Sequence, residues 1–245
     1  MSSLEGKRIL VTGAGSGIGR AAAQMFAERG AEVVLVGRRF DALEKSKETL
    51  PTALCMALDH SDEAAVAAFA AQCPELDGLF LNAGQFLNGT VESSPISIFD
   101  QMISANLRGP WLMCHHLGPR LKHGASVVFT GSNIGLRAIP DSAAYSVSKA
   151  GLHMLAKVLA LEWAPRKIRC NAIAPGPIQT AMVEARHKSS QDPDQDMARL
   201  SNVNPLKRLG LEVEVAALAA HLLSDESAWT TGCVIPVDGG ADAVY

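Results

Sequence analysis

Residues 11–19 read VTGAGSGIG, a glycine-rich stretch that indicates the fold class. It stands between a short apolar run at residues 8–12 and a helical pattern that begins at Gly17. Glycine allows a tight turn and a close approach to a pyrophosphate, whose charge the amides and dipole of a following helix stabilise. A purely structural turn would also need glycine. The order of strand, loop and helix is nevertheless the one that dinucleotide binding requires.

Short apolar or β-branched runs alternate with helical patterns along the rest of the chain. This alternation is typical of a parallel sheet with helices on both faces. The expected strands are residues 8–12, 32–36, 53–57, 77–82, 126–130, 168–173 and 233–237. The expected helices are residues 17–29, 41–49, 62–72, 95–121, 144–163 and 212–223. We therefore predict an α/β protein with a doubly wound, parallel, seven-stranded sheet, the Rossmann fold.

No repeat, low-complexity tract or Gly/Ser linker divides residues 1–245, so we expect one dinucleotide-binding domain that also carries the catalytic site. Residues 180–208 are polar and rich in Asp, Ser and Gln, and they lie between an expected strand and the last expected helix. A long insertion at this place suggests a substrate lid. A surface loop without that role is the alternative.

The composition limits the class of partner. A formal charge of -3 and a pI near 6.2 favour small molecules over nucleic acid or an acidic membrane surface. The five cysteines are scattered and never paired at metal-ligand spacing, so we expect reduced thiols and no metal site. Residues 1–7 are polar, and Gly13 interrupts the first apolar run, which argues against a signal or membrane segment. The expected location is cytoplasmic.

Tyr145 and Lys149 are four residues apart on an expected helix, so both side chains can reach the same ligand. A free tyrosine has a pKa of about 10, and acid/base work near neutrality needs a shift of roughly 3 units, about 4 kcal/mol. A positive charge at about 4 Å contributes roughly 4 kcal/mol at an effective dielectric near 20, so Lys149 can supply it. An ordinary pair on a helix surface is the alternative.

Ser132 comes thirteen residues before Tyr145, just past the expected strand at residues 126–130. Open parallel sheets bind ligands at this edge, so the Ser132 hydroxyl is a candidate to hold a substrate oxygen. A hydroxyl that caps a turn is the alternative for Ser132. For Asn106 the alternative is an amide at a helix kink.

Taken together, these residues resemble the short-chain dehydrogenase/reductase family, in its compact single-domain branch, and the resemblance covers nearly the whole chain. The matching pieces, in order, are the glycine loop, Asp59, Asn82-Ala83-Gly84, Asn106, Ser132, Tyr145 with Lys149, Pro175-Gly176 with Thr180, and Val237-Asp238-Gly239-Gly240. One departure is Leu81, where the family often carries a second Asn.

The resemblance implies an oxidoreductase that moves a hydride between a nicotinamide cofactor and a carbonyl or alcohol. In the implied mechanism Ser132 orients the carbonyl and Tyr145 is the general acid/base. Lys149 also grips the nicotinamide ribose, and Asn106 sustains a water chain for proton relay. The implied cofactor-binding residues are Gly13, Gly15, Ser16, Gly17, Ile18, Gly19, Arg38, Arg39, Asp59, Asn82, Ala83, Gly84, Tyr145, Lys149, Pro175, Gly176, Ile178 and Thr180.

The end of the second expected strand bears on the choice of cofactor. Enzymes that prefer NAD place a carboxylate there, about twenty residues past the glycine loop, to accept the ribose hydroxyls. Gly37 stands at this place and is followed by Arg38 and Arg39, which can pair with the 2′-phosphate of NADP. We expect the cofactor to be NADP, and NAD is the alternative. Two solvated arginines ahead of a helix capped by Asp41 are the alternative.

Other classes of function stay open. The first is a cofactor-binding sensor or scaffold without turnover, and the second is a dehydratase or epimerase on the same scaffold. Substrate identity is not readable, but six residues are candidates for the pocket. They are Gln85, Phe86, Asn133, Leu136, Met182 and His187.

The resemblance also implies a homo-oligomer, a tetramer, paired through the helices expected at residues 95–121 and 144–163. Leu152, Leu155 and Leu159 recur at helical spacing on the second of these helices. This row is a candidate for the contact between subunits, or it faces the sheet.

Overall fold

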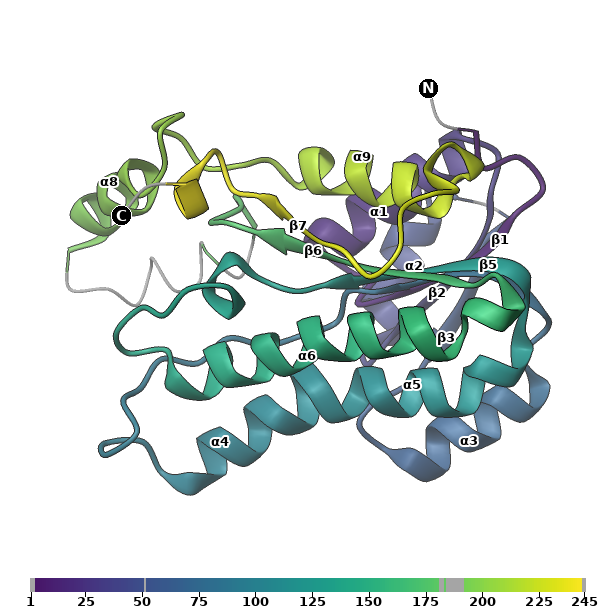
Figure 1. The fold of residues 1–245 in the computed structure, drawn as a ribbon, viewed down its shortest axis with the longest axis horizontal. Helices are drawn as coiled ribbons and strands as arrows, with labels where there is room; N and C mark the ends of the chain where they lie inside the picture. The colour runs from purple at the N-terminus through teal and green to yellow at the C-terminus, as the bar shows by residue number, and fades with distance from the viewer. Residues whose placement is uncertain (1–2, 51, 181–182, 184–191, 244–245) are drawn as a thin grey trace.

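A parallel sheet of seven strands, in the order β3-β2-β1-β4-β5-β6-β7, forms the centre of the molecule (Figure 1). The computed structural model describes residues 3–50, 52–180, 183 and 192–243. The strands are β1 (Arg8–Thr12), β2 (Glu32–Gly37), β3 (Leu54–Ala57), β4 (Leu76–Leu81), β5 (Leu121–Thr130), β6 (Arg169–Pro175) and β7 (Val234–Val237). The strand order reverses between β1 and β4, which is the switch point where such sheets bind ligands.

Helices cover both faces of this sheet (Figure 1). One face carries α1 (Gly17–Glu28), α2 (Phe40–Lys47) and α9 (Glu212–Leu223). The other carries α3 (Glu63–Gln72), α4 (Ile96–Ile103), α5 (Gly109–Leu117) and α6 (Ala143–Glu162). The doubly wound fold expected from the sequence is confirmed. In the described part of the chain, no helix combines the length and the apolar character needed to cross a membrane.

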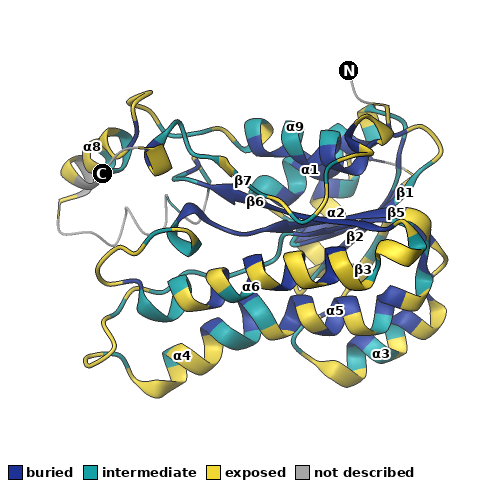
Figure 2. Ribbon diagram, in the orientation of Figure 1, coloured by how far each residue is buried: buried dark blue, intermediate teal, exposed yellow. Residues whose placement is uncertain are grey.

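The two faces have separate apolar cores because strand residues alternate between them. In β1, Ile9 and Val11 pack with α1 and α9, whereas Leu10 packs on the opposite face. Figure 2 shows that the strands are mostly buried, whereas each helix is buried on the side that faces the sheet and exposed on the other. The row Leu152, Leu155 and Leu159 belongs to the core under α6, so it faces the sheet rather than a second subunit.

The expectation of one continuous helix over residues 95–121 was wrong at its centre. Between α4 and α5 the chain forms a π-helical segment, Ser104–Arg108, and a 3-10 turn, Gly118–Arg120, follows α5. Pro110 has no backbone N–H, so it cannot donate to the carbonyl of Asn106 as an α-helix requires. β5 also begins five residues earlier than expected, at Leu121.

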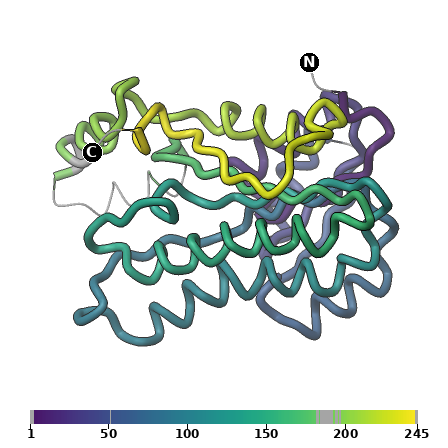
Figure 3. The backbone as a smooth tube through the Cα atoms, in the orientation of Figure 1, coloured from purple at the N-terminus to yellow at the C-terminus, as the bar shows by residue number. Residues whose placement is uncertain are grey.

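Part of the expected insertion at residues 180–208 forms a helix, α8 (Pro193–Asn202), that the sequence analysis missed. The sequence carries a local signal for the start of this helix. Asp192 caps it by accepting a hydrogen bond from the N–H of Gln195 (3.1 Å), and Pro193 occupies the first turn. Figure 3 shows the C-terminal segment returning beside the chain that follows α8. Residues 181–182 and 184–191 lie outside the described residues, so the lid stays a prediction.

Candidate active site

A cleft of about 1540 Å³ opens at the carboxyl edge of the sheet, lined by the loops that follow β1 to β6. Ligand pockets commonly measure about 300–1,000 Å³. The cleft therefore has room for a dinucleotide and a second small molecule.

The glycine turn after β1 forms one wall of this cleft. Gly13 and Gly17 adopt positive φ angles of 69° and 59°, which favour glycine. A Cβ at Gly15 would lie 2.9 Å from the Cβ of Ala42, so the turn is also too crowded for a side chain. Ser16 precedes α1 without using its side chain as a cap, and it lines the cleft with Gly17 and Ile18. This cradle fits a pyrophosphate at a helix N-terminus.

Gly19 and Leu136, which were expected at the site, lie away from the cleft. Gly19 does not line it, and a Cβ there would collide with the carbonyl oxygen of Gly13. Its glycine therefore serves the packing of the turn. Leu136 does not line the cleft either, because it is exposed after the short turn Asn133–Gly135.

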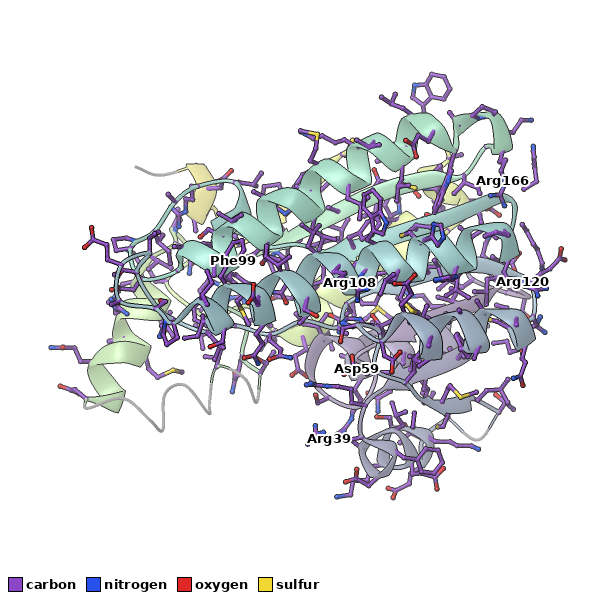
Figure 4. The ribbon with its side chains drawn as sticks, turned by 90° about the horizontal axis from the view of Figure 1, so that it is seen from below. Arg39, Asp59, Phe99, Arg108, Arg120 and Arg166 are labelled. Atoms are coloured by element: carbon purple, nitrogen blue, oxygen red, sulfur yellow. The ribbon has the colours of Figure 1, made fainter. Side chains whose placement is uncertain are left out.

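The loops after β2 and β3 line the cleft with Arg38, Arg39 and Asp59. Figure 4 shows Arg39 and Asp59 on these neighbouring loops. Arg38 and Arg39 are exposed, and Arg39 rather than Asp41 precedes α2. Burial raises the pKa of Asp59, but hydrogen bonds from the Ser61 hydroxyl (2.7 Å) and N–H (2.9 Å), with the charge of Arg38, lower it overall. Asp59 is therefore a carboxylate at neutral pH, able to accept hydrogen bonds from a ligand.

The turn Asn82-Ala83-Gly84 joins the ends of three strands. The N–H groups of Asn82 and Ala83 donate to the Thr12 hydroxyl at 2.9 and 3.0 Å. The Thr130 hydroxyl donates to the side-chain carbonyl of Asn82 at 3.1 Å. These contacts fix the floor of the cleft between β1, β4 and β5.

Ser132, Tyr145 and Lys149 meet in the middle of the cleft. The Ser132 side chain hydrogen-bonds Tyr145, and Nζ of Lys149 lies 5.7 Å from the Tyr145 ring centroid. Lys149 is buried and donates to the carbonyl of Thr130 at 2.7 Å. Ser132 Oγ also accepts from the N–H of Ile134 (3.3 Å), so it caps a turn as well. The i,i+4 pair is therefore no ordinary surface pair.

The pKa values of this group reflect its burial. Burial raises the pKa of Tyr145, while the hydrogen bond with Ser132 lowers it by less. Burial lowers the pKa of Lys149 to about 8, so its ammonium group is still charged at pH 7. The net effect is a raised pKa, so the acidification of Tyr145 that we expected from Lys149 is not observed.

Asn106 lies behind the cleft rather than in its lining. Its side-chain carbonyl accepts from the N–H of Gln85 (2.8 Å), and its amide donates to the carbonyl of Gln85 (2.9 Å) and to Ser148 Oγ (3.1 Å). The side chain therefore holds the loop after β4 against α6. Asn106 lies on the π-helical segment, as the helix-kink alternative expects, and its role in a proton relay stays a prediction.

The remaining expected residues divide into those that reach the cleft and those outside the described part. Pro175, Gly176, Ile178 and Thr180 line it after β6. Gln85, Phe86 and Asn133 also line the cleft, and the rings of Phe86 and Tyr145 are 4.7 Å apart, edge to face. Met182 and His187 lie outside the described residues.

Two buried histidines were missed. His60 follows Asp59 and lines the cleft, where burial lowers its pKa. His153 lies beneath the Ser132 loop, and its Nε2 accepts from the N–H of Ser132 at 3.3 Å. Burial and then the charge of Lys149 lower the pKa of His153 to about 4, so it is neutral at pH 7. The spacing of Tyr145, Lys149 and His153 by four residues was the signal that could have found His153.

Comparison with known proteins also indicates a nicotinamide-dependent oxidoreductase. A family model described as enoyl-(acyl carrier protein) reductase matches residues 13–242. The chain is 39% identical over 252 residues to levodione reductase of Leifsonia aquatica, covering 97% of this chain and 94% of that protein.

Solved structures agree with this match. A crystal structure of levodione reductase has a TM-score of 0.94 at 37% identity, covering 98% of this chain and 99% of that one. A structure from Beutenbergia cavernae, assigned as an NAD(P)-dependent gluconate 5-dehydrogenase with NADP bound at low occupancy, has a TM-score of 0.90 at 29% identity, covering 99% of both chains. The chain thus belongs to the short-chain dehydrogenase/reductase family of NAD(P)-dependent oxidoreductases.

Proposed function

We propose that this protein transfers a hydride between NADP(H) and a carbonyl or alcohol, with Tyr145 as the general acid/base. The observation that carries this proposal is the meeting of Ser132, Tyr145 and Lys149 at one point of the cleft. A hydroxyl donor, a titratable phenol and a buried cation are the groups that proton transfer to a carbonyl oxygen needs.

Each residue has one task in this proposal. Ser132 and Tyr145 hold the substrate oxygen between their hydroxyls, and Tyr145 donates its proton during reduction or removes one during oxidation. Lys149 is charged at neutral pH and stabilises the tyrosinate. A bound nicotinamide would supply or accept the hydride. The backbone carbonyl of Asn106 receives no hydrogen bond from Pro110, because proline has no N–H. In this proposal it accepts a hydrogen bond from a water molecule that returns protons to Lys149.

The preference for NADP rests on the end of β2. Gly37 offers no carboxylate to a ribose, and Arg38 and Arg39 line the cleft directly after it. Arginine pairs with phosphate through charge-assisted, bidentate hydrogen bonds. The similar structure from Beutenbergia cavernae binds NADP, which supports the same choice for this chain.

A cofactor-binding sensor without turnover is the alternative class. All four residues proposed for turnover are present in this chain, which favours the enzyme. A panel of carbonyls and alcohols that includes levodione and gluconate, followed by NADPH absorbance in both directions, separates the two. Turnover of any panel member supports the enzyme, whereas tight NADPH binding with no turnover across the panel supports the sensor.

We also propose self-association through α4, α5 and α6. Val147, Met154, Val158 and Leu161 form an exposed apolar row on α6, and Trp111 on α5 is 56% exposed. Exposed apolar groups of this kind mark contact surfaces between proteins. This row, rather than the buried leucine row of α6, is the proposed contact.

A further inference from the structure

Resting on the proposed hydride transfer, we propose that Arg137 binds an anionic group of the substrate. The substrate class is then a carbonyl or alcohol that also carries a carboxylate or a phosphate. Arg137 lines the cleft together with Ser132 and Tyr145, so one small molecule can place an anionic group on Arg137 and its reacting oxygen at Ser132 and Tyr145.

A rigid turn links Arg137 to Ser132. The N–H of Gly135 donates to the carbonyl of Ser132 (2.9 Å), and the N–H of Arg137 donates to the carbonyl of Asn133 (3.1 Å). Because these bonds close the turn, the backbone of Arg137 is fixed relative to the hydroxyl of Ser132. A ligand held by both residues would therefore be oriented for reaction.

The guanidinium of Arg137 has no protein partner in the described part of the chain. Its Nε atom is buried and makes no hydrogen bond, although the residue as a whole is only half-buried. Arg8 also has a buried Nε without a partner, but its Nη2 pairs with Glu32 at 2.8 Å. Buried donors in native proteins are nearly always bonded, so a guanidinium without a protein partner in the cleft is available to an anion on a ligand.

The charge of this part of the cleft agrees with an anion. Among the described residues after β4 that line it, Arg137, Lys149 and Arg199 are cations, and Asp141 is the one carboxylate. Arg137 and Asp141 form no ion pair with each other, although both line the cleft. The chain as a whole has a formal charge of -3, so positive charge is concentrated here against the overall balance.

The 2′-phosphate of the cofactor does not account for Arg137. Arg38 follows β2 and Arg137 lies in the loop after β5, and these strands are three places apart in the sheet. Neighbouring strands are about 4.8 Å apart, so the strand ends are separated by roughly 14 Å. The 2′-phosphate near Arg38 is therefore out of reach of the Arg137 turn.

The rest of the proposed substrate site fits a short molecule. Phe86 packs against the Tyr145 ring, and Ile139 and Pro140 add apolar surface. The Gln85 side chain accepts from the Gln101 amide at 2.6 Å, so amide groups also line the cleft. A short hydroxy acid, oxo acid or phosphate ester would place its anion on Arg137 and its apolar carbons on this wall.

The first test compares matched substrates. Short 2- and 3-hydroxy acids, their methyl esters and hydroxyalkyl phosphates are assayed with the wild type, Arg137→Gln, Arg137→Lys and the control Arg29→Gln, which lies outside the cleft. We expect the wild type to favour an anionic member over its neutral partner by roughly tenfold or more in kcat/KM, and Arg137→Gln to lose that preference without losing the neutral substrate. Arg137→Lys should retain part of it. Carboxylate and phosphate members report separately which anion is preferred.

The second test does not require turnover. Butyrate and inorganic phosphate are titrated by calorimetry into the NADP-loaded wild type and Arg137→Gln. At least one anion should bind the wild type about tenfold more tightly than the variant. Binding of an anion to Arg137, with no turnover of any substrate in the first test, would contradict the proposed reaction but support the anion site. Equal affinity in both proteins, no binding of either anion, or wild-type preference for the neutral esters would overturn the site.

Discussion

The backbone N–H of Ser132 donates a hydrogen bond to Nε2 of His153, one turn beyond Lys149 on α6. His153 fits beneath the Ser132 loop, and a Cβ at Gly131 would collide with its Nε2. Its Nδ1 is buried without a hydrogen bond of good geometry, although the Gly135 backbone lies near enough to favour protonation. The imidazole therefore sets the position of Ser132 from below.

Replacement of His153 by Leu should slow turnover through Ser132. The change leaves the Ser132 N–H buried without an acceptor, which costs about 1–3 kcal/mol of stability, and lets the hydroxyl shift. We expect kcat to fall roughly tenfold while the Kd for NADP stays near the wild-type value. His153→Gln, which keeps an acceptor, should recover most of kcat. Equal kcat for the Leu and Gln variants would show that the hydrogen bond has no positioning role.

The same histidine should make stability depend on pH. Its pKa is about 4 in the folded protein, against about 6.5 in an unfolded chain, so the unfolded chain binds more protons between these values. The stabilising effect is complete above about pH 6.5 and is lost as pH falls to about 4, a change of about 3 kcal/mol. Urea unfolding at several pH values should show a smaller loss for His153→Gln. A loss of the same size in both proteins would contradict this assignment.

Cofactor choice should depend on the end of β2. Arg38→Ala should weaken NADP by roughly ten- to a hundredfold and leave NAD almost unchanged, because one charge-assisted hydrogen bond contributes about 1.5–3 kcal/mol. Gly37→Asp should move preference toward NAD by accepting ribose hydroxyls and repelling the phosphate. Gly37 has an ordinary φ, and a Cβ there would lie 3.3 Å from Leu43 Cδ2, so a small shift accommodates it. Comparable NAD and NADP efficiencies in all three proteins would contradict the reading of Arg38.

Self-association should involve the exposed row of α6. Light scattering at micromolar concentration should give a particle larger than the 25.8 kDa chain, which we expect to be a tetramer. Met154→Glu places a charge in the row and should reduce the particle size. Val213→Glu, an exposed position on α9, is the matched control and should not change it. A monomeric mass for the wild type would contradict the proposed self-association.

Local patterns predicted most of the fold and much of the site. The glycine turn, the alternation of strands and helices, and the spacing of Tyr145 and Lys149 each depend on a few neighbouring residues, and the structure brings these parts together. The kink at Asn106 was expected only as an alternative to one continuous helix, and the missing N–H of Pro110 is the local signal that identifies it. His153 and Arg137 were not predicted. Their roles depend on which loop crosses α6 and which side chains remain unpaired, and only tertiary packing decides these.

Turnover by Tyr145→Phe measures the role of Tyr145 as the general acid/base. The change removes the phenolic proton but keeps the ring that packs on Phe86, so cofactor binding and folding should be retained. On a substrate found in the carbonyl and alcohol panel, we expect kcat to fall by roughly two to four decades, with the NADP dissociation constant within about threefold of the wild type. Turnover by Tyr145→Phe at the wild-type rate, with the variant folded and loaded with cofactor, would contradict the assignment of Tyr145 as the general acid/base.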